Sequence, residues 1–354
     1  MNLVVLTKQF GNYTGATIST IELLKRISSE FEKVTVLTLK SDGTKIQGVQ
    51  VQKAKSYLDL IQRLKKKRNV IGYSDDHLGF LFSFFNIKYV HTYHGNWPDA
   101  RKLNFNMFIK SFYFIPLYKR TIREASIVIN VSNYMKEKFV NSLNSCNKTI
   151  YNGIKQDEQD NFKDSQLVKE NNTNSGYLMV GNIDKRKYGK AIKIFNELKS
   201  RSFQGVIDIY GGLFDRKLVS ELQKFTFVNV KGVVNKINYK DYDALICTSA
   251  SENLPVSIVE SIINGIPVIT SNVGGISEII MNKKNGYLIN VNDYHTFANV
   301  ILHHQNLIID SKSKERIRSI FSWDTSSNIY MSIFKKVGES INEDNYSRTN
   351  TRQM

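Results

Sequence analysis

Cysteine, proline and tryptophan are scarce in this chain, which has two Cys, four Pro and two Trp among 354 residues. The two cysteines, Cys146 and Cys247, are too few for a disulfide framework or for a zinc cluster built on cysteine. The second of them lies inside an apolar segment that is predicted to be a strand. We therefore expect a protein of a reducing compartment that binds no metal at a cysteine cluster.

Long hydrophobic runs are also absent, since no stretch reaches the roughly 20 apolar residues that span a bilayer. The amino terminus, MNLVVLTKQF, lacks a positively charged lead-in, and its apolar run is too short for a signal peptide. We therefore expect a cytoplasmic protein. Contact with the inner face of the cell membrane stays open.

Acidic residues are the minority charge, with 32 Asp and Glu against 49 Lys and Arg, for a formal net charge of +17. Such an excess favours an anionic partner: nucleic acid, a membrane surface or a phosphorylated substrate. The chain is otherwise of ordinary globular composition, 41% hydrophobic and 23% charged. Its length predicts two domains, each with its own core.

Apolar strand patterns alternate with helical patterns along nearly the whole chain, which predicts two doubly wound α/β domains. A polar stretch between them predicts a linker or surface excursion, and an amphipathic helix is expected to close the chain. The predicted parts are a first domain 1–155, a linker 156–175, a second domain 176–322, a closing helix 323–341 packing back toward the first domain, and a frayed tail 342–354.

The segment from Asp243 to Ile280 carries the most specific pattern in the chain. It predicts a buried strand, a loop with Glu252, a helix with Glu260, a second buried strand and a glycine turn. Loops after the carboxyl ends of parallel strands face the ligand crevice, so Glu252 is expected at a binding site. Glu260 borders the apolar stripe of its helix and therefore requires hydrogen-bond donors as partners.

Other candidates also lie at predicted strand ends. Gly15 is in a glycine-containing loop at a helix amino terminus, and Arg186 and Lys187 occupy a second strand-to-helix loop, where backbone amides and cations favour phosphate. His94 ends a strand and could exchange a proton or polarise a hydroxyl or phosphate. His91, within the same strand, is expected to be a core residue.

Residues 101–123 combine six basic residues, no acidic ones and several aromatics. Such a segment can lie among lipid headgroups, but aromatics at this spacing also pack cores, and both interpretations stay open. The basic run at residues 63–68 is read as a solvated helix end, with a docking patch as the alternative.

The central segment, SASENLPVSIVESIINGIPVITSNVGGISEII, resembles the donor-site signature of the family-4 retaining glycosyltransferases. The resemblance extends in order and spacing over nearly the whole chain, through the glycine loop, His94-Gly95, IYNGI, VGN followed by a lysine, IYGG, VNVKGVV and FSW. It implies the GT-B fold, in which two Rossmann-like domains face a central cleft. It also implies transfer of a sugar from a nucleotide-diphosphate sugar, with retained configuration.

The resemblance assigns a role to each carboxylate. Glu252 would bind hydroxyls of the donor sugar near its reacting carbon and count as catalytic, while Glu260 would accept hydrogen bonds from the ribose diol. The backbone of Asn253, Leu254 and Pro255 would line the sugar and the diphosphate. These three residues stand where Gly-Phe-Gly is frequent in the family, so the donor sugar is not specified.

The resemblance likewise assigns the phosphate side of the site. Lys187, helped by Arg186, would hold the departing diphosphate, and Gly15 would let the first domain's loop approach the same phosphates. His94 would face the reacting centre across the cleft. No metal or other cofactor is then expected, because cations and helix amino termini neutralise the leaving group. Asn182 and Tyr188 depart from the family's usual arginine and glycine.

The function expected is therefore a hexosyl- or N-acetylhexosaminyl-transferase of cell-surface polysaccharide biosynthesis, of capsule, lipopolysaccharide or teichoic-acid type. Its partners would be a nucleotide sugar and a lipid-linked or otherwise anionic glycan acceptor. A nucleotide-sugar epimerase of the same fold is the alternative enzyme. A non-catalytic basic protein is a third possibility, although no nucleic-acid-binding motif occurs and the basic residues are scattered over several helices.

Overall fold

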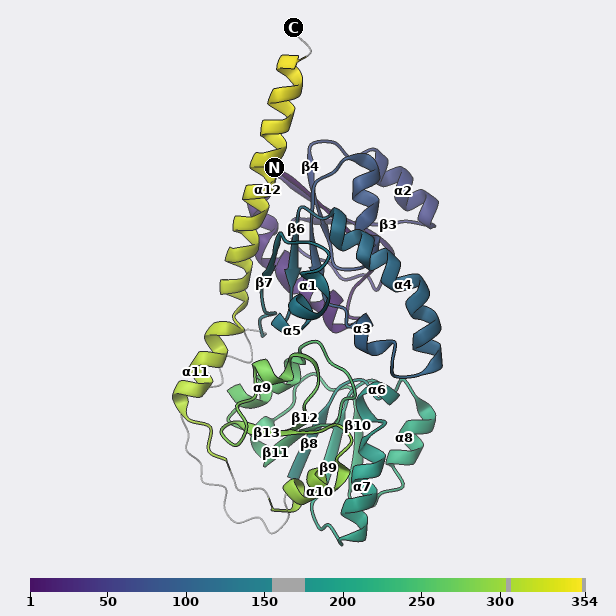
Figure 1. The fold of residues 1–354 in the computed structure, drawn as a ribbon, viewed down its shortest axis with the longest axis vertical. Coiled ribbons are helices and arrows are strands. Elements are labelled where there is room, and N and C mark those ends of the chain that lie inside the picture. Colours follow the sequence, from purple (N-terminus) through teal and green to yellow (C-terminus); the bar gives the residue numbers. More distant parts are fainter. Residues whose placement is uncertain (155–175, 304–306, 352–354) are drawn as a thin grey trace. The chain divides into compact units, whose positions relative to one another are not determined.

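The computed structural model describes residues 1–154, 176–303 and 307–351, which form two α/β units (Figure 1). The first unit comprises residues 1–153 together with the helix that follows Ser322, and the second comprises the described residues from 154 to 321. The linker expected at residues 156–175 lies outside the described residues. Each unit is built on its own parallel sheet.

The first unit contains a seven-stranded sheet in the order β3-β2-β1-β4-β5-β6-β7, with every pair of neighbours parallel. Its central strands are nearly continuous runs of apolar residues because helices cover both faces of the sheet. The strands are β1 (Asn2–Phe10), β2 (Lys33–Ser41), β3 (Val49–Lys53), β4 (Val70–Ser74), β5 (Tyr89–Tyr93), β6 (Ile127–Asn130) and β7 (Asn147–Thr149).

The helices of the first unit form two layers, one on each face of this sheet. One layer holds α1 (Gly15–Ile27) and α12 (Trp323–Thr351), whose apolar side chains share a core with β1, β2 and β4. The other layer holds α2 (Tyr57–Lys65), the 3-10 helix η2 (His77–Phe85) and α4 (Phe105–Glu124). Shorter helices complete the unit: η1 (Ser28–Glu30), α3 (Trp97–Ala100), α5 (Asn133–Met135) and η3 (Lys136–Val140).

Helix α12 packs on the first unit and lies alongside α1 (Figure 1). Its helical backbone runs on to Thr351. The helix thus continues past residue 341, where the sequence analysis places its end. Among the described residues, no helix combines the length and the apolar character needed to cross a membrane.

Helix α4 divides the aromatic residues of segment 101–123 between core and surface. Phe114 stacks on Trp97 with ring centroids 4.6 Å apart, and Tyr118 packs edge-on against Tyr93. Phe105 and Phe112, by contrast, are 77% and 65% exposed. The core interpretation therefore holds for the second half of α4, and its first half presents apolar side chains to solvent.

The second unit contains a six-stranded parallel sheet in the order β10-β9-β8-β11-β12-β13. The strands are β8 (Gly176–Val180), β9 (Val206–Tyr210), β10 (Val228–Gly232), β11 (Ala244–Cys247), β12 (Val268–Ser271) and β13 (Gly286–Ile289). The helices are α6 (Lys185–Tyr188), α7 (Ala191–Ser200), α8 (Arg216–Leu222), η5 (Tyr239–Asp241), α9 (Val256–Ile263), η6 (Gly274–Glu278), α10 (Tyr294–His303) and α11 (Ser311–Ile320).

Packing of α12 gives a direct test of the first unit's core. Phe334 is fully buried, and its ring meets Phe31 and Tyr73 edge-on at 5.7 and 5.9 Å. We expect Phe334→Ala to lower the free energy of unfolding of this unit by about 3–5 kcal/mol, because a cavity replaces the ring. Denaturant titration should show Lys335→Ala, at the next and exposed position, within about 0.5 kcal/mol of wild type. Equal effects of the two changes would contradict this account of the core.

Candidate active site

The candidate site of the second unit lies where the strand order of its sheet reverses. β8 and β11 are neighbours, and the chain departs from them in opposite directions across the sheet. Loops at the carboxyl ends of two such strands form the usual ligand crevice of an open parallel sheet. The loop after β8 leads into α6 with Arg186 and Lys187, and the loop after β11 carries Glu252.

Glu252 is the centre of this cluster and is only 8% exposed. Its Oε1 accepts a hydrogen bond from Ser249 Oγ at 2.9 Å. The same oxygen lies 3.0 Å from Arg186 Nη1 and 3.6 Å from Lys187 Nζ. The structure thus brings three of the predicted site residues into direct contact, although they come from two different loops.

Burial by itself raises the pKa of the Glu252 carboxyl, because a low-dielectric surrounding disfavours the charged form. The charges of Lys187 and Arg186 and the Ser249 hydrogen bond outweigh burial, and the pKa ends below its ordinary value of 4.5. The carboxylate is therefore ionised near neutral pH. It also partly neutralises the cationic loop, which leaves a net positive charge for an anionic ligand.

The backbone holds the cations in place. Arg186 Nη1 donates to the carbonyl of Ser251 at 2.7 Å, and the amide of Ala250 donates back to the carbonyl of Arg186 at 2.8 Å. Thr248 Oγ1 donates to the carbonyl of Lys187 at 2.8 Å. The loops after β8 and β11 are thereby fixed to each other.

Two glycines are required by close approach in this cluster. Gly274 has a φ of +61°, and a Cβ added to it would lie 1.8 Å from the carbonyl oxygen of Glu252. The next amide, of Gly275, donates to the carbonyl of Asn253 at 2.8 Å. Gly181 has a φ of +141°, and a Cβ added to it would lie 2.7 Å from Lys187 Nζ. The backbone of the glycine turn in the central segment therefore packs directly against the Glu252 loop.

Glu260 lies on α9 and is partly buried, as its position on the helical wheel predicts. Its Oε2 accepts a hydrogen bond from the hydroxyl of Tyr239 at 2.8 Å. Asn253, Leu254 and Pro255 lead from Glu252 into this helix. Pro255 is the residue before the first turn, and no side chain caps that turn, so its amides are not capped by a protein side chain.

In the first unit, Gly15 opens α1 behind Thr14, which caps the helix in a reciprocal pair with Thr17. A Cβ added to Gly15 would meet no atom within 4 Å, so the space beside it is open within the unit. The glycine that local geometry requires in this loop is Gly11, which has a φ of +143° and lies against the Asp42 carboxylate.

His94 follows the carboxyl end of β5, as predicted, and its side chain is half-buried. Burial lowers the pKa of its ring to about 4, so the ring is neutral near pH 7 and suits hydrogen bonding better than cationic acid catalysis. His91 is a fully buried core residue whose Nδ1 lies 2.9 Å from Ser74 Oγ. The core assignment of His91 is confirmed.

Two carboxyl residues at the end of β4 were not predicted as site residues. β4 lies next to β1, where the first sheet reverses its strand order. Asp75 Oδ2 accepts from Thr20 Oγ1 at 2.6 Å, and Asp76 caps η2 through the amide of Leu78 at 2.8 Å. Burial, followed by the neighbouring charge of Asp76, raises the pKa of Asp75. The sequence pattern that could have indicated them is a pair of acidic residues directly after a buried strand.

Comparisons with known proteins match both units of the chain. Residues 13–158 match glycosyltransferase family 4, and residues 160–319 match the glycosyl transferases group 1. CapJ from Staphylococcus aureus is 25% identical over 262 residues, which are 72% of this chain and 61% of CapJ. The chain thus spans less than two thirds of the length of this curated relative.

Solved structures establish the fold. Sucrose-phosphate synthase from Thermosynechococcus elongatus superposes with a TM-score of 0.75 at 15% identity, covering 96% of this chain and 100% of that one. HepE from Anabaena, solved in complex with UDP and glucose, gives a TM-score of 0.71 at 18% identity, covering 94% and 99%. The fold is GT-B, as the sequence resemblance implied.

The ion cluster around Glu252 predicts a pH-dependent part of the second unit's stability. Because the folded-state pKa of Glu252 lies below 4.5, this part is present above that pH and is lost as the pH falls below it toward the folded value. Glu252→Gln should remove this dependence. It should also lower the free energy of unfolding near neutral pH by about 1–3 kcal/mol, because two cations lose their counter-charge.

Urea titration of the second unit's transition over a series of pH values measures both effects. Glu315→Gln is the matched control, because Glu315 is an exposed glutamate of the same unit. A Glu252→Gln profile that runs parallel to the wild-type profile at all pH values would show that the cluster does not control this stability.

Proposed function

Since this chain belongs to the family-4 and group 1 glycosyltransferases, we propose that it transfers a sugar from a nucleotide-diphosphate sugar to an acceptor hydroxyl, with retained configuration. The observation that carries the proposal is the buried Glu252 carboxylate beside Arg186 and Lys187 at the strand-order reversal of the second unit. A carboxylate suits sugar hydroxyls and cations suit a diphosphate, and here the two lie within one ion cluster.

Lys187 would hold the leaving diphosphate, and Arg186 would contribute a second positive charge beside it. Charge develops on the leaving group in the transition state, and cations already held in place stabilise it without reorganisation. The uncapped first turn of α9, reached through Asn253, Leu254 and Pro255, offers amides to the same anion. With this set of groups the reaction is proposed to need no metal ion.

The nucleoside would be recognised through Glu260, whose carboxylate accepts from Tyr239 at Oε2 and can accept from a ribose diol. The open space beside Gly15 suits close approach of a phosphate to the first turn of α1. His94, neutral near pH 7, would hydrogen-bond a sugar hydroxyl at the reacting centre. The leaving phosphate itself would take the acceptor's proton on the same face of the sugar.

We propose surface-polysaccharide biosynthesis as the setting and a lipid-linked or anionic glycan as the acceptor. The family resemblance and the net charge of +17 support this assignment. The donor sugar is proposed to be a hexose or N-acetylhexosamine carried on a nucleotide such as the UDP bound by HepE. Release of free nucleotide diphosphate with a glycosylated acceptor distinguishes transfer from epimerisation, which modifies only the sugar nucleotide.

Turnover of variants with the natural donor tests the phosphate assignment. We expect Lys187→Ala to lower kcat about 10²–10³-fold, because one preorganised cation is lost at the developing charge. The assay should contain a chelator, which is expected to leave the wild-type rate unchanged. Lys185→Ala is the matched control, since Lys185 is an exposed cation of the same short helix. Equal losses in both variants would remove Lys187 from its proposed role.

The exposed face of α4 supports contact of the first unit with an anionic bilayer. Phe105, Ile109 and Phe112 follow one another at helical spacing and are 77%, 51% and 65% exposed. Residues 101–123 supply six cations and no carboxylate. Apolar side chains that enter the headgroup layer beside such cations bind a membrane surface without spanning it.

Replacing Phe105, Ile109 and Phe112 by Ser should lower partition onto vesicles with anionic phospholipid at least tenfold, since each buried apolar side chain contributes roughly 1.5–3 kcal/mol. Co-sedimentation measures the partition. The matched control replaces Leu213 and Phe214, two exposed apolar residues of the second unit, by Ser. Unchanged partition of the α4 variant would contradict the proposed contact.

A further inference from the structure

A hollow of about 460 Å³ lies on the first unit between α4 and residues 139–143. This volume falls in the range of small-molecule sites, about 300–1,000 Å³. Its apolar lining includes Phe108, Ile115, Phe139 and Leu143. These side chains form a surface on which an alkyl chain can pack.

Three cations line the same hollow: Arg101, Lys102 and Lys119. No Asp or Glu is among the lining residues, and in the described part of the chain none lies within ion-pair distance of these three. The Arg101 guanidinium lies over the Phe108 ring, 5.8 Å from its centroid, and so links the cationic and apolar parts. The hollow therefore offers positive charge beside an apolar surface.

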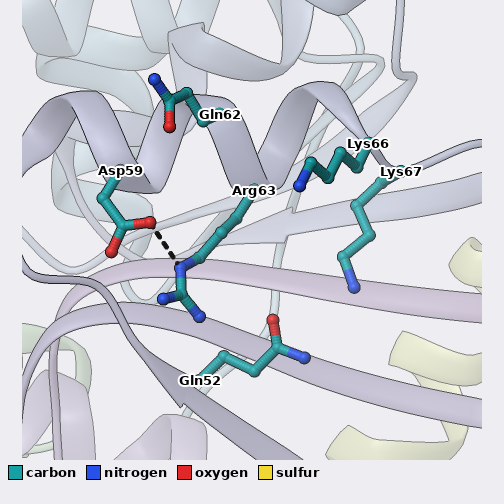
Figure 2. Close-up of a pocket in the computed structure, with 6 residues that line it drawn as sticks. All are labelled: Gln52, Asp59, Gln62, Arg63, Lys66 and Lys67. Carbon is teal, nitrogen blue, oxygen red and sulfur yellow. Dashed lines mark hydrogen bonds and ion pairs between the residues drawn. The ribbon is translucent and has the colours of Figure 1, made fainter.

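A second basic hollow on the first unit differs from the first in the pairing of its cations and in its lack of apolar residues (Figure 2). Arg63 is neutralised there by Asp59, with Nε 2.8 Å from Oδ1, and the remaining lining is Gln52, Gln62, Lys66 and Lys67. No apolar residue is among those that line it. It is suited to solvated ions, which agrees with a solvated helix end and provides a control site.

The position of the first hollow relative to the exposed face of α4 indicates the source of its ligand. Phe108, Ile115 and Lys119 occupy positions i, i+7 and i+11 of this helix, in a row next to that of Phe105, Ile109 and Phe112. A ligand in the hollow would therefore lie beside the surface proposed to contact a bilayer.

We propose that this hollow binds the phosphate group and the adjoining alkyl segment of a membrane lipid. Arg101, Lys102 and Lys119 bind the phosphate through charge-assisted hydrogen bonds, and the apolar lining covers the first methylene groups of the chain. Such chemistry is shared by a bulk anionic phospholipid and by a polyprenyl phosphate. The binding does not depend on the donor site, and only its use as an acceptor site rests on the proposed transfer.

Binding of a short-chain alkyl phosphate below its micellar concentration, measured by calorimetry on the full chain, tests the proposal. The double variant Arg101→Gln, Lys119→Gln is expected to bind it at least tenfold more weakly than wild type. The control Lys66→Gln, Lys110→Gln removes the same charge outside the hollow and should bind as wild type does. Inorganic phosphate is expected to bind at least tenfold more weakly than the alkyl phosphate.

Equal weakening in the control, unchanged binding in the double variant, or inorganic phosphate binding as tightly as the alkyl phosphate would each overturn the proposal. Vesicles of phosphatidylcholine with either phosphatidylglycerol or a polyprenyl phosphate at equal charge then separate the two lipid sources. Tighter binding to the polyprenyl phosphate vesicles identifies a polyprenyl phosphate as the ligand. Equal binding to the two kinds of vesicle identifies bulk phospholipid. No nucleotide sugar is present in this experiment, so its outcome does not depend on whether the proposed transfer is right.

Discussion

The described part of the second unit depends on keeping one carboxylate ionised in a buried position. Glu252 would be costly to bury alone, because desolvation disfavours its charged form. Arg186, Lys187 and the Ser249 hydroxyl remove that cost by ion pairing and hydrogen bonding. The two ion pairs also tie the loop after β11 to the loop after β8. Local stability and the charge pattern proposed to bind the donor therefore have one origin.

Backbone geometry makes this arrangement possible. Gly274 must be a glycine because its backbone lies against the carbonyl of Glu252, and Gly181 leaves room for the ammonium of Lys187. A side chain at either position would displace the group that the cluster needs. The turn at Gly274 and Gly275 thus acts on the site through the close packing of its backbone.

In the first unit, one half of helix α4 packs against the protein and the other half is exposed to solvent. The half of α4 around Phe114 and Tyr118 packs with Trp97 and Tyr93, which anchors the helix to the sheet. The half around Phe105 and Phe112 is left exposed beside the cations Arg101 and Lys102. An amphipathic segment that is fixed at one end and apolar at the surface at the other is suited to contact with a lipid layer.

By itself, the sequence determined the order of strands and helices, the two parallel sheets and the loops that carry Glu252, Lys187 and His94. These follow from local periodicity and from the rule that ligand loops leave the carboxyl ends of parallel strands. Only the tertiary structure decided that Glu252 pairs with Arg186 and Lys187, that burial keeps His94 neutral, and which face of α4 is exposed. Contacts between residues far apart in the chain, and the dielectric that burial imposes, are not encoded in any local pattern.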